Sequence, residues 1–345
     1  MMRQTTPSTR SSRPLVHWMW LSIAIAVCTA GRVEAQGNAA ANSQTIRVGM
    51  IGLDTSHVIA FTELINDPQA KGDLADIEIV AGFPGGTDIP PSRDRVAKFT
   101  DELRGKGLEI VDSIPALLEK VDAVLLESVD GRPHLEQARP VIEAGKPLFI
   151  DKPVAGSLAD AVAIFRLARE HQVPVWSSSS LRYAPQLVEL RQQGRLEGVF
   201  GASVWGPCSI QRPMPELYFY GVHGVETLFT IMGTGCQTVT RASTDGTDLV
   251  TGVWNDGRIG TYRGIRTGRA DFGATVFREK DIYTVDGLTG YELLVAEIAR
   301  FFKTKQPPVS AEETLEIFAF LDAAERSKEL GGQPVSVAEV LKAAQ

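Results

Sequence analysis

Residues 122–153 read DAVLLESVDGRPHLEQARPVIEAGKPLFIDKP, and this stretch decides how the chain folds. A short apolar run, 123–126, precedes a segment with helical spacing, 133–144, and a second apolar run follows at 147–150. Strands that alternate with helices form a parallel sheet with helices on both faces. We predict that the helix continues through Pro140, which removes one of its hydrogen bonds.

The same alternation extends in both directions from this stretch. Helical spacing occurs at 92–103 and 115–120, and further β-branched runs lie at 46–51, 77–81, 108–111 and 173–176. We therefore predict an α/β fold whose first domain, residues 45–176, is a Rossmann-like, doubly wound parallel sheet. Such sheets bind ligands at the carboxyl ends of their strands.

From about residue 177 the pattern changes. Strand-like runs at 199–205, 237–242, 248–254, 259–264, 272–277 and 281–285 are joined by turn signals such as Asn255-Asp256-Gly257. Two late helices follow, and Ser310 with Glu313 forms a capping box at the start of the second. Residues 177–345 are therefore expected to be an α+β domain with a large, mostly antiparallel open sheet.

The first 35 residues are interpreted as a cleaved signal peptide. Three arginines precede the apolar run 15–30, and Val33-Glu34-Ala35 offers small residues at the cleavage positions. Residues 36–44 are small and polar and form a linker. The mature protein is thus expected to be exported, either periplasmic or extracellular. An uncleaved leader would instead be a membrane anchor.

Composition limits the class of protein. The chain has 345 residues, of which 43% are hydrophobic and 22% charged, which is ordinary for globular domains and excludes a disordered or fibrous protein. Its formal net charge of −7 gives no basis for binding nucleic acid. Cys208 and Cys236 remain after cleavage, and the sequence leaves open whether they pair.

The loop after the first strand reads Gly52-Leu53-Asp54-Thr55-Ser56-His57. A dinucleotide site has G-x-G-x-x-G here, and only the first glycine is present. The Asp54 carboxylate would repel a pyrophosphate unless it points away. The Thr55 and Ser56 hydroxyls and the amino end of the following helix would favour binding of a pyrophosphate. The second strand ends without the usual ribose-binding acid, and Arg93 or Arg95 is either a 2′-phosphate ligand or a surface charge.

The block 122–153 resembles the Gfo/Idh/MocA family, named for glucose-fructose oxidoreductase, inositol dehydrogenase and a rhizopine catabolism protein. The resemblance rests on a loop histidine (His134), the turn Ala144-Gly145-Lys146 and the motif Asp151-Lys152-Pro153. Further matches occur at Arg182-Tyr183, at 221–226 (GVHGVE) and at 308–313. Together these matches cover roughly residues 45–340.

The resemblance implies a Rossmann domain that binds NAD or NADP, followed by a substrate domain whose sheet often forms homo-oligomers. It implies that Lys152 contacts the reacting sugar or polyol and that His223 exchanges the hydroxyl proton. The expected cofactor-binding residues are Gly52, Asp54, Thr55, Ser56, His57, Ser128, His134 and Asp151. The expected substrate-binding residues are Arg182, Tyr183, Tyr218, Tyr220 and Glu226. No tight ligand spacing is present, so we expect no metal.

One departure from the family pattern concerns catalysis. Many members carry Asp four residues before the helix histidine, whereas this chain has Phe219. The first hypothesis is an NAD(P)-dependent oxidoreductase that acts on a secondary hydroxyl of a sugar, polyol or glycoside. The alternatives are a redox-neutral glycoside-cleaving enzyme with tightly bound NAD, and a non-catalytic carbohydrate-binding protein that kept the fold. The sequence does not name the sugar or the nicotinamide.

Overall fold

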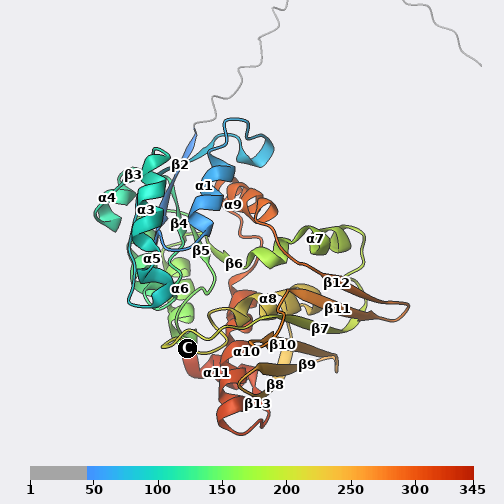
Figure 1. Ribbon diagram of the computed structural model, residues 1–345. Helices are drawn as coiled ribbons and strands as arrows, with labels where there is room; N and C mark the ends of the chain where they lie inside the picture. The colour runs from blue at the N-terminus through green and yellow to red at the C-terminus, as the bar shows by residue number, and fades with distance from the viewer. Residues whose placement is uncertain (1–44) are drawn as a thin grey trace, which may run out of the picture. The chain divides into compact units, whose positions relative to one another are not determined.

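The computed structural model describes residues 45–345 (Figure 1), so the predicted signal peptide, the alternative membrane anchor and the whole linker lie outside the described residues. The described residues form one compact unit with two sheets. Within 45–345, none of the helices combines the length and apolar character that a membrane crossing requires.

The first sheet has six parallel strands in the order β3-β2-β1-β4-β5-β6. The strands are β1 (Ile46–Ile51), β2 (Ile77–Phe83), β3 (Glu109–Ile110), β4 (Ala123–Leu126), β5 (Leu148–Asp151) and β6 (Val175–Ser178). The order reverses between β1 and β4, and this is the switch point where such sheets bind ligands. The predicted Rossmann-like sheet is therefore confirmed.

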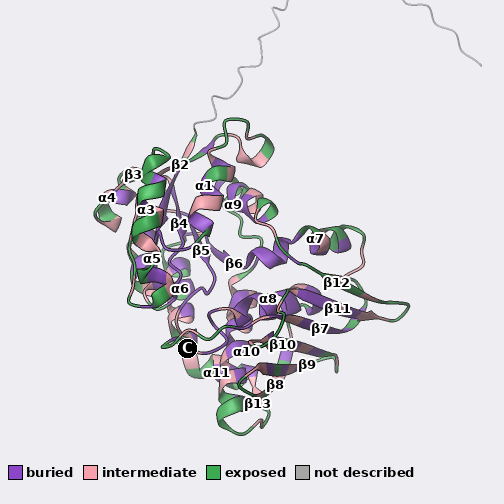
Figure 2. Cartoon of the chain, viewed as in Figure 1, coloured by how far each residue is buried: buried purple, intermediate pink, exposed green. Residues whose placement is uncertain are grey.

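Helices cover both faces of this sheet. Apolar side chains of α1 (His57–Ile65), α3 (Val96–Gly105) and α9 (Glu292–Thr304) share one core cluster with β1 and β2. The opposite face packs against α4 (Ile114–Leu118), α5 (His134–Glu143) and α6 (Leu158–Glu170). Figure 2 shows β4 buried along its length while the outer side of α3 is exposed. Because β4 and β5 are covered on both faces, their residues are continuously apolar rather than alternating.

Several predicted boundaries differ from the observed ones. The single helix expected at 92–103 is wrong, because α2 (Pro90–Arg93) and α3 are separate helices. The predicted helix over 133–144 is present as α5, and it contains Pro140. Ser157 caps α6 by accepting a hydrogen bond of 3.1 Å from the Asp160 amide. Two 3₁₀ turns, η1 (Gly72–Leu74) and η2 (Ser180–Tyr183), complete the connections of this part.

The second sheet has seven strands in the order β12-β11-β7-β10-β9-β8-β13. Its strands are β7 (Val199–Pro207), β8 (Cys236–Ser243), β9 (Thr247–Trp254), β10 (Ile259–Ile265), β11 (Gly273–Arg278), β12 (Ile282–Asp286) and β13 (Val335–Ser336). Only the β7–β10 pairing in this sheet is parallel, so the prediction of a mostly antiparallel sheet is confirmed.

The remaining helices of this half are α7 (Pro185–Gln192), α8 (Gly221–Met232), α10 (Ala311–Glu329) and α11 (Val337–Ala344). The predicted cap of α10 is present, since Ser310 Oγ accepts the Glu313 amide at 3.1 Å. Helix α8 lies against the sheet, and Gly224 allows this because a Cβ there would stand 2.0 Å from the Tyr262 ring of β10. This close packing fixes the position of α8 on the sheet.

Candidate active site

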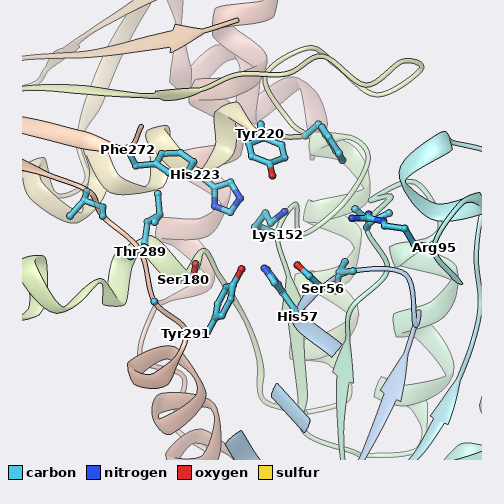
Figure 3. Close-up of a pocket in the computed structure, with 16 residues that line it drawn as sticks. Ser56, His57, Arg95, Lys152, Ser180, Tyr220, His223, Phe272, Thr289 and Tyr291 are labelled. Atoms are coloured by element: carbon cyan, nitrogen blue, oxygen red, sulfur yellow. The ribbon is translucent and has the colours of Figure 1, made fainter. Parts of the chain in front are cut away.

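A cavity of about 170 Å³ opens at the carboxyl-terminal edge of the first sheet. Residues from both halves of the chain line it. Figure 3 shows Lys152, His57, His223, Tyr220 and Tyr291 pointing toward the same space, with Arg95 to one side. Six of the predicted site residues line this cavity, namely Thr55, Ser56, His57, Lys152, Tyr220 and His223. The remaining predicted residues lie in its supporting structure or farther away.

Lys152 enters the cavity directly after β5. Only 7% of the residue is exposed, and Nζ lies 5.7 Å from the centroid of the Tyr220 ring. An ammonium over an aromatic face is attracted to the ring quadrupole while its hydrogens remain available. Among residues 45–345, no hydrogen-bond acceptor is within reach of Nζ, so the ammonium is free to bind a negatively charged or developing oxygen in the cavity.

His223 projects from the first turn of α8 on the opposite side. Its Nδ1 shares a hydrogen bond of 2.7 Å with Ser179 Oγ, which leaves Nε2 without a protein partner among the described residues. Burial, reinforced by the Lys152 charge, holds the pKa of His223 well below its ordinary value of 6.5. The imidazole is therefore neutral near pH 7 and is able to accept a proton.

The amino end of α1 and the residues before it form one wall of the cavity. Ser56 does not cap the helix with its side chain, and Thr55 Oγ1 is buried without a hydrogen-bond partner within 45–345. Arg95 also lines the cavity; its Nε donates a hydrogen bond to the Pro91 carbonyl, and its buried Nη2 has no partner in the described structure. Free N–H groups at a helix start, a hydroxyl and a guanidinium together suit a phosphate oxygen.

Asp54 does not line the cavity, which removes the electrostatic objection raised by the sequence. Its carboxylate is fully buried and accepts hydrogen bonds from Ser92 Oγ at 2.5 Å and from the Val129 amide at 2.9 Å. The carboxylate therefore joins the loops after β1, β2 and β4. Asp54 supports the site and does not face a ligand in it.

Three other predicted cofactor-binding residues have structural contacts instead. Gly52 has φ +83°, and a Cβ there would lie 2.5 Å from the Ser128 backbone. Ser128 donates a hydrogen bond to Gln137, and the buried His134 ring contacts the carbonyls of Ser128 and Val154. These contacts fix the loop after β4 beside the loop after β1.

Four predicted substrate-binding residues lie outside the cavity. Arg182 forms buried ion pairs with Glu226 at 2.8 Å and Glu313 at 2.7 Å. Glu226 also accepts hydrogen bonds from Ser178 Oγ and the Ser179 amide. Tyr183 packs on Trp176, and Tyr218 is fully buried against Phe318. The Arg182–Glu226 pair therefore holds the Ser178–Ser179 segment that orients His223.

His57 and Asp151 meet below the cavity, together with a residue that the sequence analysis missed. His57 Nδ1 lies 2.8 Å from Asp151 Oδ2 and 3.9 Å from Glu127 Oε2. Burial, with Asp151 nearby, raises the pKa of Glu127 well above its usual range. The sequence did carry a signal for Glu127, because this acid directly follows the wholly apolar run 123–126. A charged residue is unusual at the end of a buried strand.

The sequence singled out Phe219, whereas three other cavity residues, Tyr291, Thr289 and Phe272, carried no sequence signal. The Phe219 ring lies 5.3 Å from the Tyr220 ring in a tilted arrangement, and it gives the cavity wall an aromatic surface. Tyr291, Thr289 and Phe272 come from the distant end of the chain. Tyr291 directly precedes α9 and Phe272 directly precedes β11, so their positions depend on how these elements pack, which local sequence patterns do not encode.

Cys208 and Cys236 are separate, buried free thiols. Burial raises the pKa of Cys208 to about 11 and that of Cys236 to about 12. Both sulfurs pack within the second half of the chain, away from the cavity lining. The cysteines are structural residues in this fold.

Comparison with known proteins agrees with this architecture. Residues 89–179 match the model of a family described as an oxidoreductase family with an NAD-binding Rossmann fold, which is the Gfo/Idh/MocA family. The curated dehydrogenase aclE of Aspergillus oryzae is 32% identical over 154 residues, which are 44% of this chain and 40% of that protein. The aligned part thus spans less than half of that relative.

Solved structures extend the similarity of fold over most of the chain. Scyllo-inositol dehydrogenase from Lactobacillus casei has a TM-score of 0.66 at 15% identity, covering 86% of this chain and 99% of that one. GenD2 from gentamicin A biosynthesis, solved in complex with NAD, has a TM-score of 0.68 at 16% identity, covering 85% and 96%. At these identities the likeness establishes the fold, and the match to the family model is confined to residues 89–179.

Proposed function

We propose that this chain, whose residues 89–179 match the model of the Gfo/Idh/MocA oxidoreductase family, oxidises or reduces a secondary alcohol of a sugar, polyol or glycoside with NAD or NADP. One observation carries the proposal. Lys152 from the end of β5 and His223 from α8 line a single buried cavity at the switch-point edge of the sheet. An ammonium and a neutral imidazole facing one small space are suited to a reacting hydroxyl.

The residues present fit a nicotinamide dinucleotide at its pyrophosphate. Thr55, Ser56 and the start of α1 would hold the phosphate oxygens, and Arg95 would balance their charge. The unpartnered Thr55 hydroxyl and Arg95 Nη2 support this assignment, as does the turning of Asp54 toward Val129. A bound nicotinamide would supply the hydride acceptor or donor.

The chain's own groups would manage the proton and the charge. During oxidation, His223 would take the hydroxyl proton at Nε2, because Ser179 occupies Nδ1. Lys152 would stabilise the negative charge that develops on the substrate oxygen as that proton leaves. Phe219 has no proton to exchange, so the pair works without the acid that many relatives carry at this position.

The cavity lining supports a small polyhydroxylated substrate. Tyr220, Phe272 and Tyr291 offer aromatic faces, while Ser180 and Thr289 offer hydroxyls. Sugars have apolar C–H faces and hydroxyl edges, so this mixture of flat rings and hydrogen-bonding groups matches their surface.

The test begins with the purified mature protein. Denaturation followed by mass spectrometry should release nicotinamide, or titration should show binding of added NAD or NADP. Lys152→Met should then abolish turnover while preserving the fold. If denaturation releases no dinucleotide and added NAD and NADP do not bind, the non-catalytic carbohydrate-binding alternative is favoured. Retained NAD with glycoside cleavage and no net redox change would favour the redox-neutral alternative.

We also propose that the chain forms homo-oligomers through the second sheet. Large apolar side chains are exposed on its strands, including Phe200 at 54%, Ile259 at 53% and Ile282 at 66%. Exposed apolar groups on one sheet commonly mark an interface between subunits. Light scattering of the wild type and of a Phe200→Lys, Ile259→Lys variant tests this. The double substitution should reduce the mass to that of a monomer, whereas an oligomer formed through another surface would keep its mass.

Export of the mature chain is likewise a proposal, and it is based on the leader-like residues 1–35. Cell fractionation with mass determination of the amino terminus tests it. A protein that retains residue 1 in the cytoplasm would contradict export, and a full-length chain in the membrane fraction would indicate the anchor.

A further inference from the structure

Three ionisable side chains converge on the floor of the cavity. His57 is the first residue of α1, Glu127 directly follows β4, and Asp151 ends β5. One potential ligand atom from each lies within 4.8 Å of the other two. The carboxyl ends of parallel strands share one sheet edge, which explains how residues so far apart in sequence meet here.

These separations suit coordination of one ion. His57 Nδ1 stands 2.8 Å from Asp151 Oδ2 and 3.9 Å from Glu127 Oε2. Ligands bound at about 2.0–2.2 Å from a shared metal ion are separated by roughly 3–4 Å from one another. Small side-chain adjustments would therefore bring all three atoms onto a common centre.

Burial makes the carboxylates exceptional. Glu127 and Asp151 are each 0% exposed. Both Glu127 oxygens and Asp151 Oδ1 have no hydrogen-bond partner among residues 45–345, and Asp151 Oδ2 has only the His57 nitrogen at 2.8 Å. Other buried acids in the same region are fully engaged, such as Asp54 with Ser92 and Val129. Burying a carboxylate whose oxygens lack partners costs several kcal/mol of desolvation free energy. A bound cation would offset a cost of about that size.

The protein's own cations account for only part of this charge. Asp151 faces His57, and Lys152 lies over the Tyr220 ring without a hydrogen bond to either carboxylate in the described structure. Glu127 has no cation closer than the His57 nitrogen at 3.9 Å in the described residues. A divalent ion would neutralise both carboxylates and use the imidazole lone pair.

We propose that His57 Nδ1, Glu127 and Asp151 bind one divalent first-row transition-metal ion, such as Mn²⁺ or Zn²⁺, at the floor of the cavity. One imidazole with two carboxylates favours these ions over Ca²⁺, which prefers oxygen ligands alone. His57 is the ligand that also lines the cavity, so the ion lies immediately beneath the space shared by Lys152 and His223. The site stands apart from the proposed nicotinamide chemistry and does not require it.

The test uses the purified mature chain without nicotinamide or substrate. After dialysis against a chelator, titration with Mn²⁺ or Zn²⁺ should give one ion per chain by calorimetry and elemental analysis. Glu127→Gln, which keeps the side-chain shape, should weaken binding by at least about tenfold. Asp130→Asn is the matched control, because Asp130 is buried nearby but paired with Arg132, and it should bind the ion as the wild type does.

Thermal unfolding separates loss of the site from loss of the fold. Added metal should raise the Tm of the wild type and of Asp130→Asn, and leave that of Glu127→Gln nearly unchanged. In the metal-free state Glu127→Gln should be at least as stable as the wild type, because the substitution removes a buried acid. Absence of stoichiometric Mn²⁺ and Zn²⁺ binding, or equal binding by Glu127→Gln, would overturn the proposal and leave the proposed oxidoreductase activity untouched.

Discussion

The Asp54 carboxylate accepts a hydrogen bond of 2.9 Å from the Val129 amide, and this contact joins the loops that follow β1 and β4. These two strands flank the switch point of the first sheet. An ordinary dinucleotide loop has its second glycine at this position. Here Asp54 occupies the position and links the loops behind the cavity wall. Thr55 and Ser56, which follow Asp54, still line the cavity, where they would meet an anion.

Replacing Asp54 should therefore destabilise the fold. Asp54→Ala leaves the Ser92 hydroxyl and the Val129 amide without their buried acceptor, at an expected cost of about 2–4 kcal/mol in unfolding free energy. Urea denaturation followed by circular dichroism measures this. Asp94→Ala is the control, since its side chain is 59% exposed and should change stability by less than about 0.5 kcal/mol.

Ser179 should act as a positioning residue for His223. Ser179→Ala removes the 2.7 Å contact to Nδ1, so the ring loses its fixed orientation. We expect kcat to fall about tenfold or more with little change in KM, because general acid–base catalysis contributes roughly 10²- to 10⁴-fold in total. Ser179→Thr retains the hydroxyl and should recover much of the rate. A change in KM alone would argue against this role.

The acid limb of the pH–rate profile should lie below pH 6.5. Burial and the Lys152 charge lower the pKa of His223 from 6.5, so its imidazole stays neutral as the pH falls through that value. The rate of alcohol oxidation, measured as kcat/KM, should decline only at lower pH, where the ring gains a proton. Lys152→Gln removes one cause of the shift, and any residual activity should show the limb moved toward higher pH.

The buried pair Arg182–Glu226 should matter for stability more than for substrate affinity. Arg182→Met leaves Glu226 uncompensated, at an expected cost of about 3–5 kcal/mol. Arg182→Met combined with Glu226→Gln should recover part of that loss, which a double-mutant cycle in urea measures. If Arg182 instead bound substrate directly, KM would rise in the folded variant while stability stayed near that of the wild type.

Local patterns predicted the first sheet closely. The runs 46–51 and 123–126 coincide with β1 and β4, because central parallel strands must be apolar on both faces. Strand β3 is shorter than predicted, since it lies at the edge of the sheet and pairs only with β2. The helix predicted at 92–103 is interrupted because the Asp94–Arg95 junction separates α2 from α3.

The candidate site was predictable only in part. Lys152 and His223 stand in motifs that single them out, and the structure brings both to one cavity. Tyr218 sits in the same stretch as Tyr220 yet turns into the core against Phe318. Neighbouring residues near a helix start face different directions, and sequence spacing alone did not reveal which ring faces the cavity.

The sequence by itself determined the order of strands and helices, the family resemblance of block 122–153, and the residue types available for chemistry. Tertiary structure alone decided that Asp54 points at Val129, that Arg182 pairs with Glu226, and that His57, Glu127 and Asp151 meet. The physical reason is that periodicity and turn chemistry act over a few residues, whereas these contacts arise where separate strand ends converge at one sheet edge.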